Sequence, residues 1–449
     1  MKRLWTVIPP CYSDIHGFQA VVNATDGLGL VDDPSRYPLL SIDGEGHRER
    51  HGGHGEGGPG GPPDREKTGQ RPHGGRACRH PAEAAEPESA RSGAAPGQEA
   101  PRSCEPGRHP PEGQRVTHTG IRESDIIRGT EQKVRAAFAE DTAWFHPTFV
   151  LMTTAPSASM IGSDLGNIAA DLAQTGSIPV GVVDLCGDRD YLYGVSMTLE
   201  ALGKLLLAPA QTIPNTVNLL GCNTIDWTQD MLDNTRALLQ TAGFQVHTVW
   251  GMQETAARLK SGAAAAVNLV VNIAGLRLAR YMHEAYGVPY VVGAPFGAAQ
   301  TRRILAALRD PSREVPISAG AETEAEVLIL AEQLTANALR QVLEDQGFRA
   351  IRVLSFLDMD RELRRPGDGK LTGEDQLAEQ LAAPSVKLVI GDPDYKPLTD
   401  RALPWIDLPD PGSMFPASPV PRTDLTGTRA EAWLAAGLTQ APGGADPAG

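Results

Sequence analysis

The chain has few cysteines for its length, and none of them stands in a metal-binding spacing. Its 449 residues contain five cysteines, and no two of them form a CxxC pair. Scattered thiols in this number exclude a disulfide scaffold, and without a CxxC pair a zinc or ferredoxin-type site built by this chain alone is not expected. The thiols are Cys11, Cys78, Cys104, Cys186 and Cys222.

The chain also lacks an excess of basic residues and long apolar runs. Its 41 Lys and Arg face 55 Asp and Glu, which leaves a formal net charge of -14. Nucleic-acid and anionic-membrane surfaces need clustered basic side chains, so we expect neither partner. No apolar run reaches the roughly 20 residues that span a bilayer. The N-terminal apolar stretch is too short for a signal peptide, so we expect a cytoplasmic protein.

Residues 44–115 contain no Val, Ile, Leu, Met, Phe, Tyr or Trp. A segment without such side chains cannot bury enough apolar area to offset the entropy lost on ordering, so we predict a disordered insertion. Its richness in Arg, Gly, Pro and Ala is also typical of GC-rich DNA read out of frame, so a mis-translated segment is the alternative. Six histidines lie here, but without a scaffold they do not predict a structured metal site.

Elsewhere, short apolar runs rich in β-branched residues alternate with helical stretches. This alternation predicts parallel sheets covered by helices on both faces. Strands are expected at 149–152, 178–183, 216–220, 245–249, 266–271, 290–292, 327–330, 350–354 and 386–390. Helices are expected at 166–174, 196–207, 227–241, 254–260, 277–285, 298–309, 334–346 and 373–381.

Breaks in this pattern divide the chain into three doubly wound, Rossmann-like α/β subdomains. We predict the first at 1–43 plus 116–208, the second at 209–312 and the third at 313–449, which includes a C-terminal arm. Ligands of doubly wound sheets bind at the carboxyl ends of strands. The polar turns at 221–224, 272–275 and 391–393 are therefore the places to look for a site.

The stretch 153–165, TTAPSASMIGSDL, has the form of a strand end, a small-residue turn and a helix start. It resembles the cluster-binding turn of the nitrogenase component 1 type oxidoreductase family. The resemblance extends in the family's order over further blocks, at 11–20 with 27–34, at 120–133, at 266–290 and at 328–394. It implies the same three-subdomain fold and an oxidoreductase subunit.

This chain departs from the family at the positions where the resemblance implies cluster cysteines. The turn has Ala155 or Pro156 at the ligand position, a second ligand position falls near Tyr37, and the cofactor-bearing subunit's cysteine is replaced by Asn272. Iron-sulfur clusters require thiolates. Cys11, which matches a family ligand, is therefore the position where an iron-sulfur cluster shared with a partner chain is expected, with a structural thiol as the alternative.

Several other residues are candidates for a substrate or cofactor pocket. Ser157 and Ser159, with Ser163, can receive an anion at a helix start, although capping by Ser163 or Asp164 is the alternative. Glu123 and Asp125 lie in an acidic loop and can bind substrate or donate protons, or make local turn bonds. Arg189 can hold an anionic substrate, with a surface ion pair as the alternative.

The resemblance implies a sister component 1-like subunit, in a homo- or hetero-oligomer such as a heterotetramer. It also implies a component 2-type ATP-dependent iron-sulfur reductase that delivers electrons. In agreement with the use of ATP by the reductase and not by this chain, the chain has no GxxxxGK[ST] nucleotide-binding loop. The predicted activity is reduction of a small molecule or cofactor. The alternative is a non-catalytic scaffold or assembly subunit for a metal cofactor, paired with a catalytic paralogue, and a decayed gene product is a third reading.

Overall fold

The computed structural model describes residues 12–33, 113–156, 158, 163–312, 324–410 and 422–440. These residues form three sheets in which every pair of neighbouring strands is parallel. The predicted α/β class with several doubly wound sheets is therefore confirmed. The boundaries predicted for the subdomains stay a prediction.

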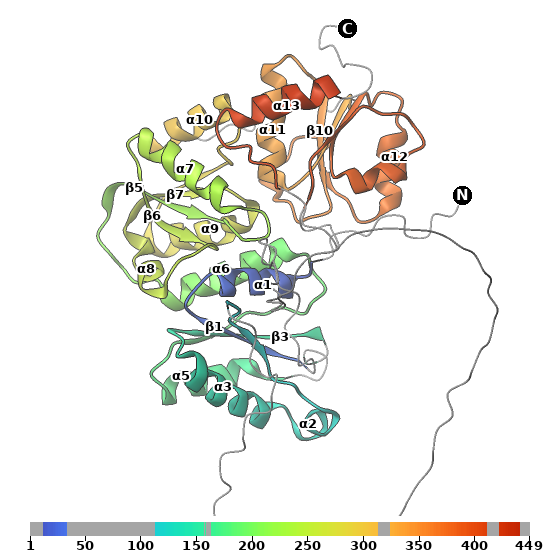
Figure 1. Cartoon of the computed structure of the whole chain (residues 1–449). Coiled ribbons are helices and arrows are strands. Elements are labelled where there is room, and N and C mark those ends of the chain that lie inside the picture. The colour runs from blue at the N-terminus through green and yellow to red at the C-terminus, as the bar shows by residue number, and fades with distance from the viewer. Residues whose placement is uncertain are drawn as a thin grey trace, which may run out of the picture. The chain divides into compact units, whose positions relative to one another are not determined.

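The first sheet has the strand order β2-β1-β3-β4, and its central strands β1 and β3 are mostly apolar and buried. Helices α1 and α6 pack on one face, and α3 and α5 pack on the other, as Figure 1 shows. The elements are α1 (Asp14–Asn23), β1 (Leu28–Asp32), β2 (Val116–His118), α2 (Glu123–Arg128), α3 (Glu131–Phe145), β3 (Val150–Thr154), α5 (Leu165–Thr175), β4 (Val180–Val182) and α6 (Tyr191–Leu206).

The second sheet has the order β6-β5-β7-β8. Helix α9 packs on β5, β7 and β8, and α6 of the first subdomain packs against α9. The elements are β5 (Ile213–Leu220), α7 (Gln229–Thr241), β6 (Gln245–Trp250), α8 (Ala256–Lys260), β7 (Ala265–Val270), α9 (Leu276–Tyr286), β8 (Tyr290–Val292) and α10 (Ala298–Arg309).

The third sheet has the order β11-β10-β9-β12-β13. Its elements are β9 (Val327–Leu330), α11 (Gln333–Asp345), β10 (Ile351–Ser355), β11 (Gly369–Lys370), α12 (Glu374–Ala382), β12 (Leu388–Gly391), β13 (Trp405–Asp407) and α13 (Arg429–Gln440). The arm expected after Pro397 thus contains a strand and a helix. It returns to the second subdomain, where the amide of Ala298 donates to Glu431 Oε1 at 2.6 Å.

Two further features differ from the sequence-based expectations. The short strands β1 and β2 were not among the expected strands. Strand β2 is polar. Thr117 is nevertheless buried there, since its hydroxyl donates to Asp141 Oδ2 at 2.8 Å. The acidic loop begins a helix, α2, since Asp125 accepts a hydrogen bond from the amide of Arg122 at 2.8 Å in a capping arrangement. The segment predicted to be disordered, 44–115, lies outside the described residues except for its last three.

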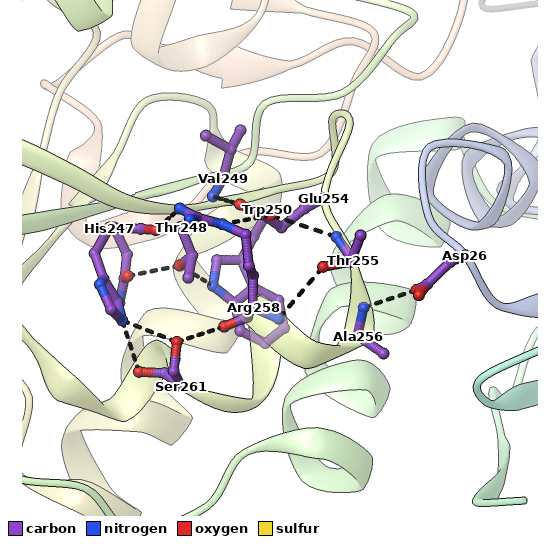
Figure 2. A network of polar contacts seen from close by, with 11 residues as sticks. Asp26, His247, Thr248, Val249, Trp250, Glu254, Thr255, Ala256, Arg258 and Ser261 are labelled. Atoms are coloured by element: carbon purple, nitrogen blue, oxygen red, sulfur yellow. Dashed lines mark hydrogen bonds and ion pairs between the residues drawn. The ribbon is translucent and has the colours of Figure 1, made fainter.

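The first and second subdomains are joined by backbone-directed polar contacts beside α8. Asp26 Oδ1 accepts a hydrogen bond from the amide of Ala256 at 2.7 Å, and the amide of Glu254 donates to the carbonyl of Ala24 at 3.1 Å. Figure 2 shows Asp26 at one edge of this network and Glu254 beside Arg258. The buried Glu254 carboxylate also accepts from the amide of Val249 at 3.2 Å, which fixes the joint to β6.

The strand orders place a topological switch point in each sheet. In the second sheet the chain crosses from one side of β5 to the other, so the switch point lies between β5 and β7. In the third sheet it lies between β9 and β12. The crevice at a switch point is where doubly wound folds bind ligands. Among the described residues, no helix is long and apolar enough to cross a membrane.

Candidate functional site

A pocket of about 70 Å³ lies where the switch points of the second and third sheets meet. It accommodates a small group or a few water molecules, since one water needs roughly 10 to 15 Å³ measured in this way. Its polar lining includes Tyr191, Asp226, Asn272, Glu332, Asp410 and Arg422, and its apolar lining includes Trp227, Met231, Phe296, Leu330, Leu408 and Leu425. Convergent polar groups on an apolar wall are the usual composition of a ligand site.

Asp226 is the centre of a hydrogen-bonded network in this pocket. Its Oδ1 atom accepts from the Tyr191 hydroxyl at 2.6 Å. Its Oδ2 atom accepts from the side-chain amides of Asn223 and Asn272, both at 2.8 Å. Burial raises the pKa of Asp226 above its ordinary value, although its hydrogen bonds oppose the shift. The acid form of Asp226 is therefore populated at higher pH than that of an exposed carboxylate.

Tyr191 begins α6 and is fully buried. Burial and the neighbouring Asp226 carboxylate raise the pKa of its hydroxyl well above the ordinary value. The hydroxyl therefore stays protonated and donates to Asp226.

Glu332 links the second and third sheets at the pocket wall. It caps α11, because its carboxylate accepts from the amides of Leu334 at 3.1 Å and Thr335 at 2.9 Å. The same carboxylate accepts from the amide of Ile273 at 3.0 Å, which follows β7. Burial raises the pKa of Glu332, these amides oppose the shift, and the charge of Asp226 adds to it. The Asp226 carboxylate therefore disfavours ionisation of Glu332.

Arg422 supplies the positive charge among the polar lining residues. Burial lowers the pKa of its guanidinium, and the charge of Asp226 opposes that shift. Within the described part of the chain, no hydrogen bond or ion pair engages this guanidinium. A guanidinium is suited to hold an anionic or carbonyl-bearing ligand, because its planar group presents several donors.

Of the residues predicted to form a pocket, Asn272 lies in it. Arg189 lies elsewhere, in an ion pair with Asp358 at 3.0 Å and over the ring of Tyr193 at 4.4 Å. Asp125 caps α2, as described above. Glu123 begins α2, but its side chain lies outside what the structure describes, as do Ser157, Ser159 and Cys11. The described members of the predicted set, Asn272, Arg189 and Asp125, therefore lie in different places, and the roles of all the predicted residues stay predictions.

Asp226, Tyr191, Glu332 and Arg422 were not among the residues singled out from the sequence. Three of them carried a usable signal, because Asp226 and Glu332 closely follow the strands β5 and β9, and Tyr191 follows the polar run after β4. No local sequence pattern distinguishes Arg422, which reaches the pocket from the C-terminal arm.

The described end of the TTAPSASMIGSDL stretch, Ser163 with Asp164, makes polar contacts at the carboxyl edge of the first sheet. The Ser163 hydroxyl donates to the buried Asp32 at 2.7 Å, so it does not cap the helix. Asp164 caps α5 by accepting from the amide of Asn167 at 3.2 Å. A Cβ atom at Gly187 would lie 2.5 Å from Pro156 Cγ, so the turn packs directly against the loop that follows β4.

The described residues do not fit an iron-sulfur cluster by themselves. Their cysteines are Cys186, which is exposed, and Cys222, which is buried. Burial raises the pKa of Cys222 well above its ordinary value, which disfavours the thiolate that iron needs. The pocket lining contains no cysteine or histidine, and Asn272 there is engaged with Asp226.

His247 and Ser261 form a close pair that is not a nucleophile and base. The Nε2 atom of His247 lies 2.9 Å from the Ser261 carbonyl oxygen and 3.0 Å from its hydroxyl (Figure 2). A ring nitrogen that donates to the carbonyl cannot accept the hydroxyl proton, and that hydroxyl donates to the carbonyl of Arg258 at 2.7 Å. The pair closes the end of α8.

Comparison with known proteins agrees with this fold. The family model described as nitrogenase component 1 type oxidoreductase matches residues 100–362, more than half of the chain. A solved structure described as nitrogenase Cp1 at pH 6.5 superposes with a TM-score of 0.63 over 98% of this chain and 93% of that one. The identity is 12%, so this likeness concerns the fold alone.

Two curated relatives have different roles. One is a component of the light-independent protochlorophyllide reductase of Nostoc punctiforme, which is 26% identical over 231 residues that cover 49% of this chain and 45% of that protein. The other is the nitrogenase iron-molybdenum cofactor biosynthesis protein NifE of a Nostoc species, which is 26% identical over 291 residues that cover 61% and 60%. The matches thus span about half of the length of these relatives.

Proposed function

Because the chain belongs to the nitrogenase component 1 type oxidoreductase family, we propose that it is an oxidoreductase subunit that reduces a small molecule or cofactor group. The pocket between the second and third sheets is the proposed reaction site. The observation that carries this proposal is the set of Asp226, Tyr191 and Glu332 around a small cavity at two switch points. In the proposed complex, a sister subunit completes the assembly and an ATP-dependent iron-sulfur reductase delivers the electrons.

Reduction of an unsaturated bond consumes protons as well as electrons, and the pocket is suited to supply them. Asp226 has a raised pKa, so its acid form can transfer a proton to a bound substrate and be reprotonated afterwards. Tyr191 and Asn272 orient its carboxyl group through hydrogen bonds. Arg422 would hold an anionic or carbonyl oxygen of the substrate, and the apolar wall excludes water from the remainder.

An iron-sulfur cluster, when bound, supplies one-electron transfer. We expect such a cluster between this chain, at Cys11, and a partner chain, since the described residues do not provide the remaining thiolates. The relatives act in protochlorophyllide reduction and in cofactor biosynthesis, so the substrate class is a proposal and not a property transferred from either. The cytoplasmic location also stays a prediction.

A scaffold or assembly subunit is the second candidate. It is favoured by one observation, namely that Asn272, which is tied to Asp226, stands where the cofactor-bearing subunit has a cysteine. A pocket of this kind can hold a cofactor precursor through hydrogen bonds without ligating its metal.

Anaerobic co-purification with the sister chain, followed by iron analysis, EPR and an assay with the reduced reductase and ATP, separates the two candidates. The redox proposal expects iron in the complex and ATP-dependent oxidation of the reductase. Asp226→Asn should lower substrate reduction by about 100-fold, the contribution of a positioned general acid, with the iron content unchanged. A complex without iron, or one that never oxidises the reductase, would remove the redox role and favour the scaffold.

A further inference from the structure

We propose that Asp14, Cys186 and Asp188 form a binding site for one divalent transition-metal ion of the zinc class. One carboxylate oxygen of each aspartate and the Cys186 sulfur all lie within 4.8 Å of one another. The site lies at the carboxyl edge of the first sheet, and none of its three residues lines the pocket described above. The inference goes beyond the proposed function and does not depend on electron transfer by this chain.

Two segments far apart in the sequence create this arrangement. Asp14 is the first residue of α1, while Cys186 and Asp188 lie in the loop between β4 and α6. The amide of Asp14 donates to the carbonyl of Arg189 at 2.9 Å. Asp14 Oδ2 in turn accepts from the amides of Cys186 at 3.4 Å and Gly187 at 3.2 Å. The Asp14 carboxylate is thus fixed facing the loop.

The second carboxylate oxygen of Asp14 is the observation that indicates a bound ion. Asp14 is fully buried, yet among the residues that the structure describes its Oδ1 atom has no hydrogen-bond partner. An unpartnered carboxylate oxygen in a buried position is destabilising, unless a cation or a proton occupies the space beside it. A metal ion shared with Cys186 and Asp188 would supply that partner.

The ligand types select the class of ion. One thiolate and two carboxylates suit zinc, cobalt(II) or iron(II), which accept sulfur and oxygen ligands at about 2.3 Å and about 2.0 to 2.2 Å. In the structure the Cys186 thiol donates to Asp188 Oδ1 at 2.8 Å. Metal binding breaks the S–H bond, releases the proton to solvent and forms a metal–sulfur bond, without any oxidation or reduction. Cys186 and Asp188 are exposed, so a fourth position stays open to water.

The neighbouring turn explains why a single ion fits better than a cluster. Pro156, one of the two residues that the resemblance places at a ligand position, packs its ring against Gly187 beside Cys186. Among the described residues, Cys186 is the one thiol at this edge, and a single ion needs no more than that.

Titration of the full-length, tag-free, metal-free protein with cobalt(II) tests the proposal, with the thiolate-to-cobalt absorption band as the readout. We expect one equivalent to produce the band, Cys186→Ser to abolish it, and Asp14→Asn and Asp188→Asn to weaken cobalt binding by at least about tenfold. The six histidines of the 44–115 segment cannot produce this band, because they have no thiolate. Circular dichroism of each variant checks that it folds.

Asp184→Asn is the matched control, since Asp184 is an exposed carboxylate of the same loop outside the cluster. It should bind cobalt as the wild type does. A band that persists in Cys186→Ser would place the thiolate at another cysteine and overturn the proposal. Equal weakening by Asp184→Asn and Asp188→Asn would also overturn it, because general loop acidity and not a defined site would then attract the ion.

Discussion

At the scale of single residues, the third subdomain carries an ion pair that is almost completely removed from water. Arg340 on α11 and Asp368 are 2.6 Å apart, and each side chain is 1% exposed. Burial lowers the pKa of Arg340, and the Asp368 carboxylate opposes that shift. Asp368 also accepts from the amide of Val353 at 2.9 Å, so one carboxylate ties a helix to a strand.

Asp368→Ala should lower the free energy of unfolding by about 3 to 5 kcal/mol, because it leaves the Arg340 charge buried without a partner. Urea denaturation followed by circular dichroism measures this loss. Glu326→Ala is the control, since it removes the exposed pair with Lys387 and should change stability by no more than about 1 kcal/mol. Similar losses in both variants would mean that the Arg340 charge is not buried in solution.

Asp226 gives a prediction of pH dependence. Its folded-state pKa lies above the unfolded value of about 3.9. The folded state therefore binds more protons, and the contribution of Asp226 to stability is present below the unfolded pKa and lost as the pH rises through the folded pKa. Asp226→Asn removes this loss, so its stability relative to wild type should increase as the pH rises from about 4 to 7.

Urea denaturation at a series of pH values tests this slope. Asp233→Asn, a change of an exposed carboxylate on α7, should leave the pH dependence of the wild type unaltered. A relative stability of Asp226→Asn that decreases with pH would show that the folded protein holds Asp226 as the anion.

At the scale of elements, α1 and α6 approach so closely that glycine is required on both. A Cβ atom at Gly17 would lie 2.1 Å from the carbonyl oxygen of Tyr191, and one at Gly194 would lie 1.9 Å from that of Asp14. The contacted atoms belong to the backbone, so a side chain cannot be accommodated by a rotamer change. This contact positions Tyr191 for the pocket and Asp14 for the proposed metal site.

Gly194→Ala should destabilise the protein by about 1 to 3 kcal/mol, because the helices must separate. It should also weaken cobalt binding, since Asp14 moves with α1. Gly166→Ala in α5 is the control, because its Cβ atom meets nothing closer than 3.7 Å. There the alanine should be neutral or stabilising by up to about 1 kcal/mol. Thermal and urea unfolding of both variants provide the comparison, and a Gly194→Ala protein as stable as Gly166→Ala would contradict the close helix contact.

At the scale of the whole molecule, charged groups connect the first and third subdomains. Lys370 on β11 lies 3.1 Å from Asp190 and forms a shorter ion pair with Asp358. Burial and the charge of Asp358 raise the pKa of Asp190, and Lys370 opposes this shift. Although burial acts against it, Lys370 and Arg189 hold the pKa of Asp358 below its ordinary value. The cations therefore keep two neighbouring carboxylates together across the contact.

Lys370→Met should loosen this contact, because Asp190 and Asp358 then repel each other with one cation fewer between them. Hydrogen exchange should become faster at β11 and at the first turn of α6, while the remainder of each sheet keeps its protection. Lys387→Met, which removes an exposed pair within the third subdomain, should leave exchange at both places unchanged. Unchanged exchange in Lys370→Met would show that apolar packing alone holds the contact.

The sequence by itself determined the class of fold. Apolar, β-branched runs such as Val327–Leu330 and Tyr290–Val292 form strands at the predicted residues, because strands of a parallel sheet are buried on both faces and need such side chains. Asn272 was also singled out from its place after a strand, and it lies in the pocket, although its role stays a prediction. The polar strand β2 could not be predicted, because Thr117 becomes compatible with burial only when Asp141, on α3, accepts a hydrogen bond from its hydroxyl.

Only the tertiary structure decided which strand ends meet. Asp226, Glu332 and Arg422 share one pocket because the switch points of two sheets and the C-terminal arm come together there, and no local pattern encodes that meeting. The same holds for Asp14 and Cys186, which are 172 residues apart and joined by a close helix contact. The chemistry of a side chain is known from the local sequence, whereas the distance between two side chains depends on how the elements between them pack.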